Sequence, residues 1–251
     1  MDWLSLAGVK QEEIRRLASI PLSEVTPSIR DFTRSVTTQK QEVALIAALK
    51  RADPDTARSW ADRDLLAVAG ECDEADVGAV AVYTEPSVFG TSLDDLRAVA
   101  AAVSAPVLRL DLVLHPLQVH QARLYGADAV LLCARAVDAA TLATLISVAR
   151  SAHMAPVVAV QTRGEVEQAL TAGAVLLGIA SPTGVLDLPH LETLAALVPP
   201  QKTLIALDPV RSAREYAALR GTVDAALVDE AILAASTVGA ALARLAGRGN
   251  P

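Results

Sequence analysis

The chain has 251 residues, of which 52% are hydrophobic and 20% charged, and its formal net charge is −7. The negative charge argues against binding to nucleic acid, because proteins that bind it concentrate Lys and Arg on one face. Asp, Arg, Gln or Gly interrupts every apolar stretch well short of the roughly 18 residues that cross a bilayer, so the sequence predicts no contact with a membrane. The first residues lack the pattern of a signal peptide, and we expect a cytoplasmic protein.

The first forty residues precede any strand pattern and are predicted to form a helical extension, residues 1–40. Apolar residues recur at helical spacing from Trp3 to Ala18, and a second helix is expected from Ser28 to Thr37. A single apolar face on the first helix favours packing or a subunit contact over a membrane anchor. We expect the extension to cover one end of the domain.

A repeat of 47 or 48 residues organises the remainder of the chain. Short apolar runs follow Gly78, Gly126, Gly173 and Gly221. Further runs occupy residues 42–49, 105–110, 155–160 and 202–207. Continuous apolar runs of this length are typical of strands covered on both faces, as in a parallel sheet under helices. The sequence therefore predicts eight parallel strands.

Helical segments alternate with these runs. Ser92 and Asp187 stand at N-cap positions and Pro116 at a first helical position. Eight strands alternating with eight helices close into a (βα)8 barrel, the α/β fold known as the TIM barrel, and 251 residues is a usual length for one such domain. We predict one domain over residues 1–251, with reactive groups at the C-terminal ends of the strands and the repeat glycines in turns at the opposite end.

Segments at these strand ends resemble the indole-3-glycerol phosphate synthase family in fixed order. Residues 48–55 (ALKRADPD) are similar to the family's A-E-I-K-R-x-S-P-S segment, and residues 83–96 to its L-T-E-x-x-x-F-x-G-S-x-x-D-L segment. Further similar segments are residues 106–112, 115–119, 122–132 and 225–232, in an alignment that runs from about Pro21 to Leu245. The resemblance implies a lyase of tryptophan biosynthesis, which closes an indole ring by decarboxylating and dehydrating a carboxyphenylamino deoxyribulose phosphate.

The chain departs from the family at the residues to which the resemblance assigns proton transfer. Leu110 replaces the general-acid lysine, between the retained Arg109 and Asp111. Ala48, Ala159 and Ala180 replace two glutamates and an asparagine, and Asp53 or Asp55 replaces the serine of the S-P-S segment. Each acid or base contributes roughly 10²- to 10⁴-fold to a rate, so these losses predict almost no synthase turnover.

The phosphate site that the resemblance implies is altered as well. Asp208-Pro209 replaces a Ser-Gly after the seventh strand, and Asp229 replaces a glycine after the eighth. Pro209 lacks the N–H that a phosphate would bind, and each carboxylate at roughly 5 Å costs about 3 kcal/mol at an effective dielectric near 20. The sequence predicts that a phosphorylated substrate is rejected.

Two interpretations of the polar residues at the strand ends remain open. Lys50 with Asp53, Asp208 and Asp229 forms a candidate acid–base set at one rim. In the alternative, the three aspartates cap helices that begin there or are simply solvated, and Lys50 pairs with a carboxylate such as Glu85.

Glu85 and Asp111 are further candidates for catalysis, although we expect them to be structural partners of nearby cations. The candidate binding residues are Arg51, Asp53, Phe89, Ser92, Arg109, Asp208 and Asp229.

Metal and cofactor sites are not expected. His115, His120, His153 and His190 lack the spacing of zinc ligands, and two cysteines, Cys72 and Cys133, are most simply buried thiols.

The leading hypothesis is a synthase-like barrel that has lost the reaction, a pseudoenzyme with a binding, assembly or regulatory role. It would bind a small molecule at the top of the barrel, and a protein partner or a second copy of the chain are further candidate partners.

One alternative is a lyase or isomerase acting on an unphosphorylated substrate, which requires an open, partly apolar pocket where Lys50 and an aspartate converge. A mouth filled by Leu110 and Leu207 would argue against this enzymatic alternative. The other alternative is a residual synthase.

Overall fold

A closed barrel of eight parallel strands forms the centre of the protein in the computed structural model, which describes residues 3–17, 27–38 and 42–247. The strands are β1 (Ala44–Leu49), β4 (Ala79–Tyr83), β5 (Val107–Leu110), β6 (Ala129–Cys133), β7 (Ala155–Val160), β8 (Leu176–Ile179), β9 (Thr203–Ala206) and β10 (Ala225–Val228). Strand β1 pairs with β4 on one side and with β10 on the other, so the sheet has no edge. The predicted (βα)8 barrel is confirmed.

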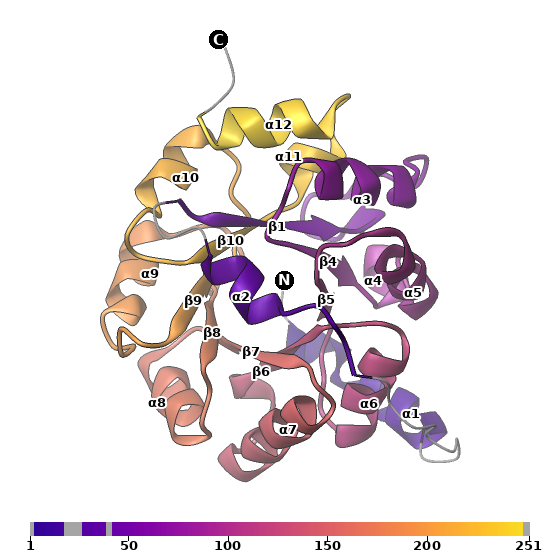
Figure 1. The fold of residues 1–251 in the computed structure, drawn as a ribbon. Coiled ribbons are helices and arrows are strands. Elements are labelled where there is room, and N and C mark those ends of the chain that lie inside the picture. Colours follow the sequence, from indigo (N-terminus) through magenta and orange to yellow (C-terminus); the bar gives the residue numbers. More distant parts are fainter. Residues whose placement is uncertain (1–2, 18–26, 39–41, 248–251) are drawn as a thin grey trace.

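An outer helix follows each strand, and together these helices surround the barrel (Figure 1). They are α3 (Leu65–Glu74), α5 (Leu93–Ala102), α6 (Pro116–Leu124), α7 (Ala139–Ser151), α8 (Arg163–Thr171), α9 (Leu188–Ala195), α10 (Ala213–Ala218) and α12 (Val238–Leu245). Ser92 caps α5 in a reciprocal capping box, Asp187 caps α9, and Pro116 opens α6, as predicted. Short helices α4 (Pro86–Phe89), η2 (Ala134–Ala136) and α11 (Glu230–Leu233) occupy loops after strands.

No helix of the described residues is both long and apolar enough to span a membrane.

Most strands begin up to four residues later than the apolar runs predict, because the repeat glycines belong to the preceding turns. Gly126, Gly173 and Gly221 have φ angles of 94°, 86° and 78°, a left-handed conformation that favours glycine. Before β4 the left-handed residue is Asp76 instead of Gly78. The glycines therefore serve turn geometry at the N-terminal end of the barrel, as expected.

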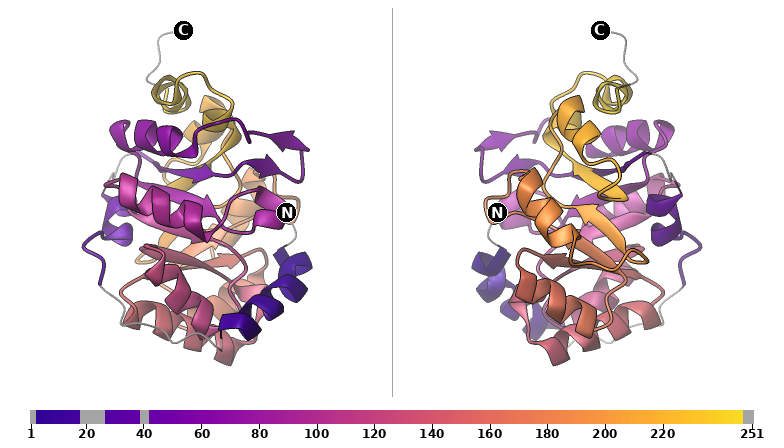
Figure 2. Two further views of the ribbon diagram at one scale, coloured as in Figure 1. Left: turned by 90° about the vertical axis from the view of Figure 1, so that its right-hand side faces the viewer. Right: turned by 90° about the vertical axis from the view of Figure 1, so that its left-hand side faces the viewer.

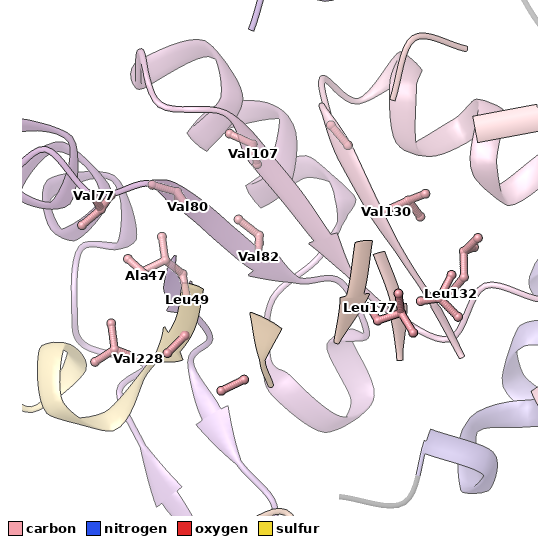
Figure 3. Close-up of a cluster of buried hydrophobic side chains, with 14 of the residues drawn as sticks. Ala47, Leu49, Val77, Val80, Val82, Val107, Val130, Leu132, Leu177 and Val228 are labelled. Atoms are coloured by element: carbon pink, nitrogen blue, oxygen red, sulfur yellow. The ribbon is translucent and has the colours of Figure 1, made fainter. Parts of the chain in front are cut away.

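Two layers of buried side chains follow from the alternation of side chains along each strand. Residues such as Ala47, Val80 and Val130 face outward and pack under the helices (Figure 3). Their neighbours in sequence, such as Ile46 and Ala81, belong to a separate cluster inside the barrel. The interior is thus filled with side chains.

The two helices of the N-terminal extension lie at opposite ends of the barrel, so the expectation that both cover one end is wrong (Figure 2). Helix α2 (Phe32–Thr37) begins four residues later than predicted and places Phe32 and Val36 in the interior cluster, at the N-terminal end. Helix α1 (Ala7–Leu17), with a preceding turn η1 (Trp3–Leu6), contacts α6 near the C-terminal ends of the strands. The predicted end of this helix at Ala18 lies outside the described residues.

A buried ion cluster attaches α1 to the barrel. Lys10 is only 1% exposed, and its Nζ lies 2.8 Å from Asp111 and 2.9 Å from Glu85, at the ends of β5 and β4. Glu13 on the same helix lies 3.0 Å from the same nitrogen. Burial by itself would lower the pKa of Lys10, but the carboxylates outweigh it and raise the pKa. The helix is therefore held by charges that are already removed from water.

We predict that Lys10→Met lowers the free energy of unfolding by about 3 kcal/mol, because it leaves buried carboxylates short of a cation. Urea unfolding measures the change. Arg15→Met is the matched control, since Arg15 is 72% exposed and its pair with Glu12 should contribute little. Equal effects of the two substitutions would contradict the role given to Lys10.

The same cluster predicts a loss of stability in acid. Burial by itself would raise the pKa of Asp111, but Arg109 and Lys10 hold it below its usual range. The pairs therefore stabilise the fold above pH about 4, and this contribution disappears as the pH falls through the lowered pKa. Unfolding curves between neutral and acidic pH should show a smaller loss for Lys10→Met than for the natural chain.

Gly126→Ala should destabilise the protein more than Gly173→Ala. Both positions have a left-handed backbone, which costs an alanine roughly 1–2 kcal/mol. A Cβ at Gly126 would also lie 2.7 Å from the Cβ of Ala100, whereas a Cβ at Gly173 meets no atom within 4 Å. Thermal unfolding of the two variants tests whether this close approach adds to the backbone cost.

Candidate functional site

A cavity of about 420 Å³ opens at the C-terminal end of the barrel, where enzymes of this fold place their reactive groups. Its polar rim carries Lys50, Asp53, Asp55, Arg135, Glu165, Asp208, Arg211 and Asp229. Its floor is made of apolar side chains from inside the barrel. The mouth is therefore open and partly apolar, not filled as a collapsed site would be.

The floor is shaped by inward-facing residues at the ends of the strands. Leu110 and Leu131 lie beside Ala159, whose small side chain leaves space. Leu207 fits inward because β8 has Gly178 opposite it, where a Cβ would lie 2.5 Å from the leucine side chain. These residues offer contacts to an apolar group and no proton donor.

An aromatic pair forms another part of the wall. The rings of Tyr83 and Phe89 have centroids 4.2 Å apart, and both side chains line the cavity. Phe89, a predicted binding residue, is therefore in place to contact a ligand. Burial raises the pKa of Tyr83, so its phenol is neutral at ordinary pH.

Lys50 lies between two carboxylates at the end of β1. Its Nζ is 2.8 Å from Asp53 and 2.6 Å from Asp229, and it approaches the Tyr83 ring at 5.4 Å. Burial by itself would lower the pKa of Lys50, but its negative partners outweigh burial and raise the pKa. Lys50 is therefore a charged, already paired ammonium and a poor nucleophile. Lys50 thus pairs with carboxylates, as the structural interpretation expects, but its partners do not include Glu85, which binds Lys10.

Asp53 and Asp229 are held by backbone donors as well as by Lys50. Asp53 lies in a hairpin that sequence reasoning missed, β2 (Ala52–Asp53) and β3 (Arg58–Ser59), and accepts N–H bonds from Asp55 and Thr56 at 2.9 and 3.0 Å. The pKa of Asp53 is lowered, because the hydrogen bonds and the charge of Lys50 outweigh burial.

Asp229 caps α11 through the N–H of Glu230, as expected. Asp53 caps no helix, since α3 begins at Leu65 with Asp64 as its cap.

Asp208 is a further buried carboxylate at the mouth. It is 5% exposed, and the N–H of Ser181 donates to its Oδ2 at 2.6 Å. No side chain of the described residues forms an ion pair with it. Burial raises its pKa, although the hydrogen bonds from Ser181 and the charge of His190 act in the opposite direction. The expectation that Asp208 is a cap or is solvated is wrong, because Ser212 caps α10 and Asp208 is buried.

The other predicted site residues lie away from the cavity. Asp111 and Glu85 belong to the ion cluster of Lys10, together with Arg109, which is fully buried and lies 2.6 Å from Asp111. Arg51 pairs with Asp95 at 2.7 Å.

Ser92 caps α5 and does not line the cavity. The structure thus places Asp111 and Glu85 with nearby cations, as the structural interpretation expects.

Sequence reasoning missed Lys10, Ser181 and Tyr83. Lys10 is separated from Asp111 by 101 residues, and nothing local distinguishes it from a surface lysine. Ser181 contributes a backbone N–H, which no side-chain pattern reveals.

Both cysteines are buried, as expected. Burial raises the pKa of Cys133, which lines the cavity, to about 11, so it is not a reactive thiolate. Within the described part of the chain, no three His, Cys, Asp or Glu side chains form a group that could hold a metal ion.

Comparisons with known proteins place this barrel among its relatives. The sequence model of the family described as indole-3-glycerol phosphate synthase matches residues 6–245. The chain is 34% identical to the indole-3-glycerol phosphate synthases of Mycobacterium leprae (strain Br4923) and Mycobacterium tuberculosis (strain ATCC 25618 / H37Rv), and 33% identical to that of Mycolicibacterium gilvum (strain PYR-GCK). In each case the similarity covers 98% of this chain and 93% of the relative. The chain therefore belongs to the indole-3-glycerol phosphate synthase family.

Proposed function

We propose that this chain binds an unphosphorylated small molecule in the mouth of the barrel and does not carry out the ring closure of the synthases. It would then be a pseudoenzyme of its family with a binding or regulatory role. The observation that carries the proposal is the occupation of backbone N–H donors at the rim by the chain's own carboxylates. Asp208 accepts from Ser181, and Asp229 accepts from Glu230.

Such carboxylates compete with a phosphate for the same place. In this fold, N–H groups after the last strands and at helix N-termini attract phosphate. Here the Ser181 donor is already used by Asp208, and Pro209 has no N–H. An ionised carboxylate at roughly 5 Å from a phosphate charge opposes binding by about 3 kcal/mol at an effective dielectric near 20.

Proton transfer is the second difficulty for the synthase reaction. Leu110 stands where the resemblance places the acid lysine, and its side chain is part of the apolar floor. Lys50 is the lysine that lines the cavity, and two carboxylates hold it as an ammonium ion. Loss of one general acid alone lowers a rate roughly 10²- to 10⁴-fold.

Two enzymatic functions are second candidates, each favoured by one observation. Family membership over nearly the whole chain favours a residual synthase, since relatives with that name share 98% coverage. The open cavity, where Lys50 converges with Asp53 and Asp229, favours a lyase or isomerase acting on an unphosphorylated molecule. The raised pKa of Lys50 leaves it able to act only as an acid or a fixed positive charge.

We also propose a cytoplasmic location. Cys72 and Cys133 are free thiols in the structure, which fits a reducing compartment.

The purified protein should not convert the carboxyphenylamino deoxyribulose phosphate into its indole product. Indole fluorescence follows the reaction, and the synthase of Mycobacterium tuberculosis serves as the positive control in the same assay. Appreciable turnover, or growth of a tryptophan auxotroph that depends on this chain, would overturn the proposal in favour of the residual synthase.

A second experiment tests the anion site directly. The double variant Asp208→Ser with Pro209→Gly removes the carboxylate and restores a backbone donor, so its affinity for inorganic phosphate should rise at least about tenfold. Calorimetric titration with phosphate measures the change, with Asp31→Ser at the other end of the barrel as the control. Tight phosphate binding by the natural chain would refute the reasoning from the rim carboxylates.

A further inference from the structure

We infer that the mouth binds an uncharged molecule with an apolar body about the size of one aromatic ring, which lies on the floor against Ala159 and Leu207. The inference rests on the proposed function and narrows it, since an unphosphorylated molecule could still be a cation, an anion or neutral. It is carried by the hydrocarbon of the floor, by the pairing of the buried charges within the chain, and by the neutral state of a phenol and a thiol in the wall.

The floor presents hydrocarbon that the chain itself leaves partly uncovered. Leu207 and Ala180 line the cavity and are only partly buried, whereas Leu110 is 2% exposed. Leu207 fits inward because of Gly178, where a Cβ would lie 2.5 Å from the leucine side chain. Covering the remaining hydrocarbon with an apolar ligand removes it from water and is therefore favourable.

A small residue leaves space in this floor. Ala159, near the end of β7, belongs to the interior cluster and lines the cavity with a single methyl group. The cavity of about 420 Å³ lies within the usual range for small-molecule sites, which bind mostly apolar bodies. The paired rings of Tyr83 and Phe89 add an aromatic surface to the wall. A single ring with a short side chain can therefore lie within this space.

The charged groups that are buried at the mouth already have partners. Lys50 lies between two carboxylates, at 2.8 and 2.6 Å. Asp208 accepts the N–H of Ser181 at 2.6 Å, and the positive charge of His190 acts on it as well. Burying an ion is unfavourable unless an opposite charge compensates for its lost hydration. A charged ligand on the floor would have to compete for groups that are already paired.

The other charged residues of the rim are more open to solvent. Asp55, Arg135 and Arg211 are exposed. Glu165 is partly buried, and its carboxylate accepts the N–H of Gln161 at 2.7 Å. Water and salt screen the attraction between such groups and a charged ligand, so ion pairs at the rim contribute little. They do not compensate for a charge that is carried down to the floor.

Two further ionisable side chains in the wall carry no charge at neutral pH. Burial raises the pKa of Tyr83 and raises that of Cys133 to about 11, so the phenol and the thiol both stay protonated. Apolar contact is then the main source of affinity at the floor. A neutral ligand gains this contact without losing the hydration of an ion.

Four probes that share a phenylethyl body and differ in charge test the inference. They are 2-phenylethanol, 2-phenylethylamine, 3-phenylpropionate and 2-phenylethyl phosphate, titrated calorimetrically into the full chain at neutral pH. The alcohol should bind at least about tenfold more tightly than each charged probe, because it alone keeps no ion away from water. This series needs no substitution and so does not depend on a variant that folds.

Ala159→Leu then locates the body of the ligand. The larger side chain extends into the cavity and should weaken 2-phenylethanol about tenfold or more, with folding checked by circular dichroism. Ala101→Leu is the matched control, since it makes the same change at an exposed position of α5 and should leave the affinity unaltered.

Three outcomes would overturn the inference and leave the proposed function standing. They are no binding of 2-phenylethanol at millimolar concentration, equal or tighter binding of the amine or the carboxylate, and alcohol binding that Ala159→Leu leaves intact. Tightest binding of 2-phenylethyl phosphate, or turnover of the phosphorylated substrate of the synthases, would instead contradict the proposed function itself. The two failures are therefore distinguishable.

Discussion

Because β1 pairs with both β4 and β10, each strand of the closed sheet has one face toward the barrel axis and one toward the helices. The alternation of side chains then divides the apolar residues into an interior cluster and an outer one. The last inward-facing residue of a strand necessarily belongs to the floor of the mouth. A single position such as Leu110 therefore decides whether that floor holds a proton donor or a hydrocarbon group.

Above this floor, most charged groups of the mouth are paired with other groups of the same chain. Lys50 is matched by Asp53 and Asp229, and the N–H of Ser181 is matched by Asp208. A site organised in this way keeps the barrel architecture of its family, while its rim carries carboxylates at the ends of the last two strands.

The fold was predictable because its signals are local and repeated. The run of residues 155–160 coincides with β7, and Pro116, Ser92 and Asp187 begin helices as their chemistry suggests. The site was only partly predictable, because its pairs join distant segments: Lys50 and Asp229 lie 179 residues apart. Loop structure explains the remaining errors. The β2–β3 hairpin is too short to leave a pattern, and the cap of α10 lies four residues beyond Asp208.

Helix α2 affects how a ligand could enter and leave the cavity at the opposite end of the barrel. Phe32 and Val36 pack against the interior cluster, and the described interior above them is filled. Within the described part of the chain, the cavity is thus closed toward the N-terminal end of the barrel. An occupant must leave by the route through which its successor enters, so arrival and departure cannot overlap. If the protein acts by binding a small molecule, as proposed, the residence time of one molecule limits how quickly the next can bind.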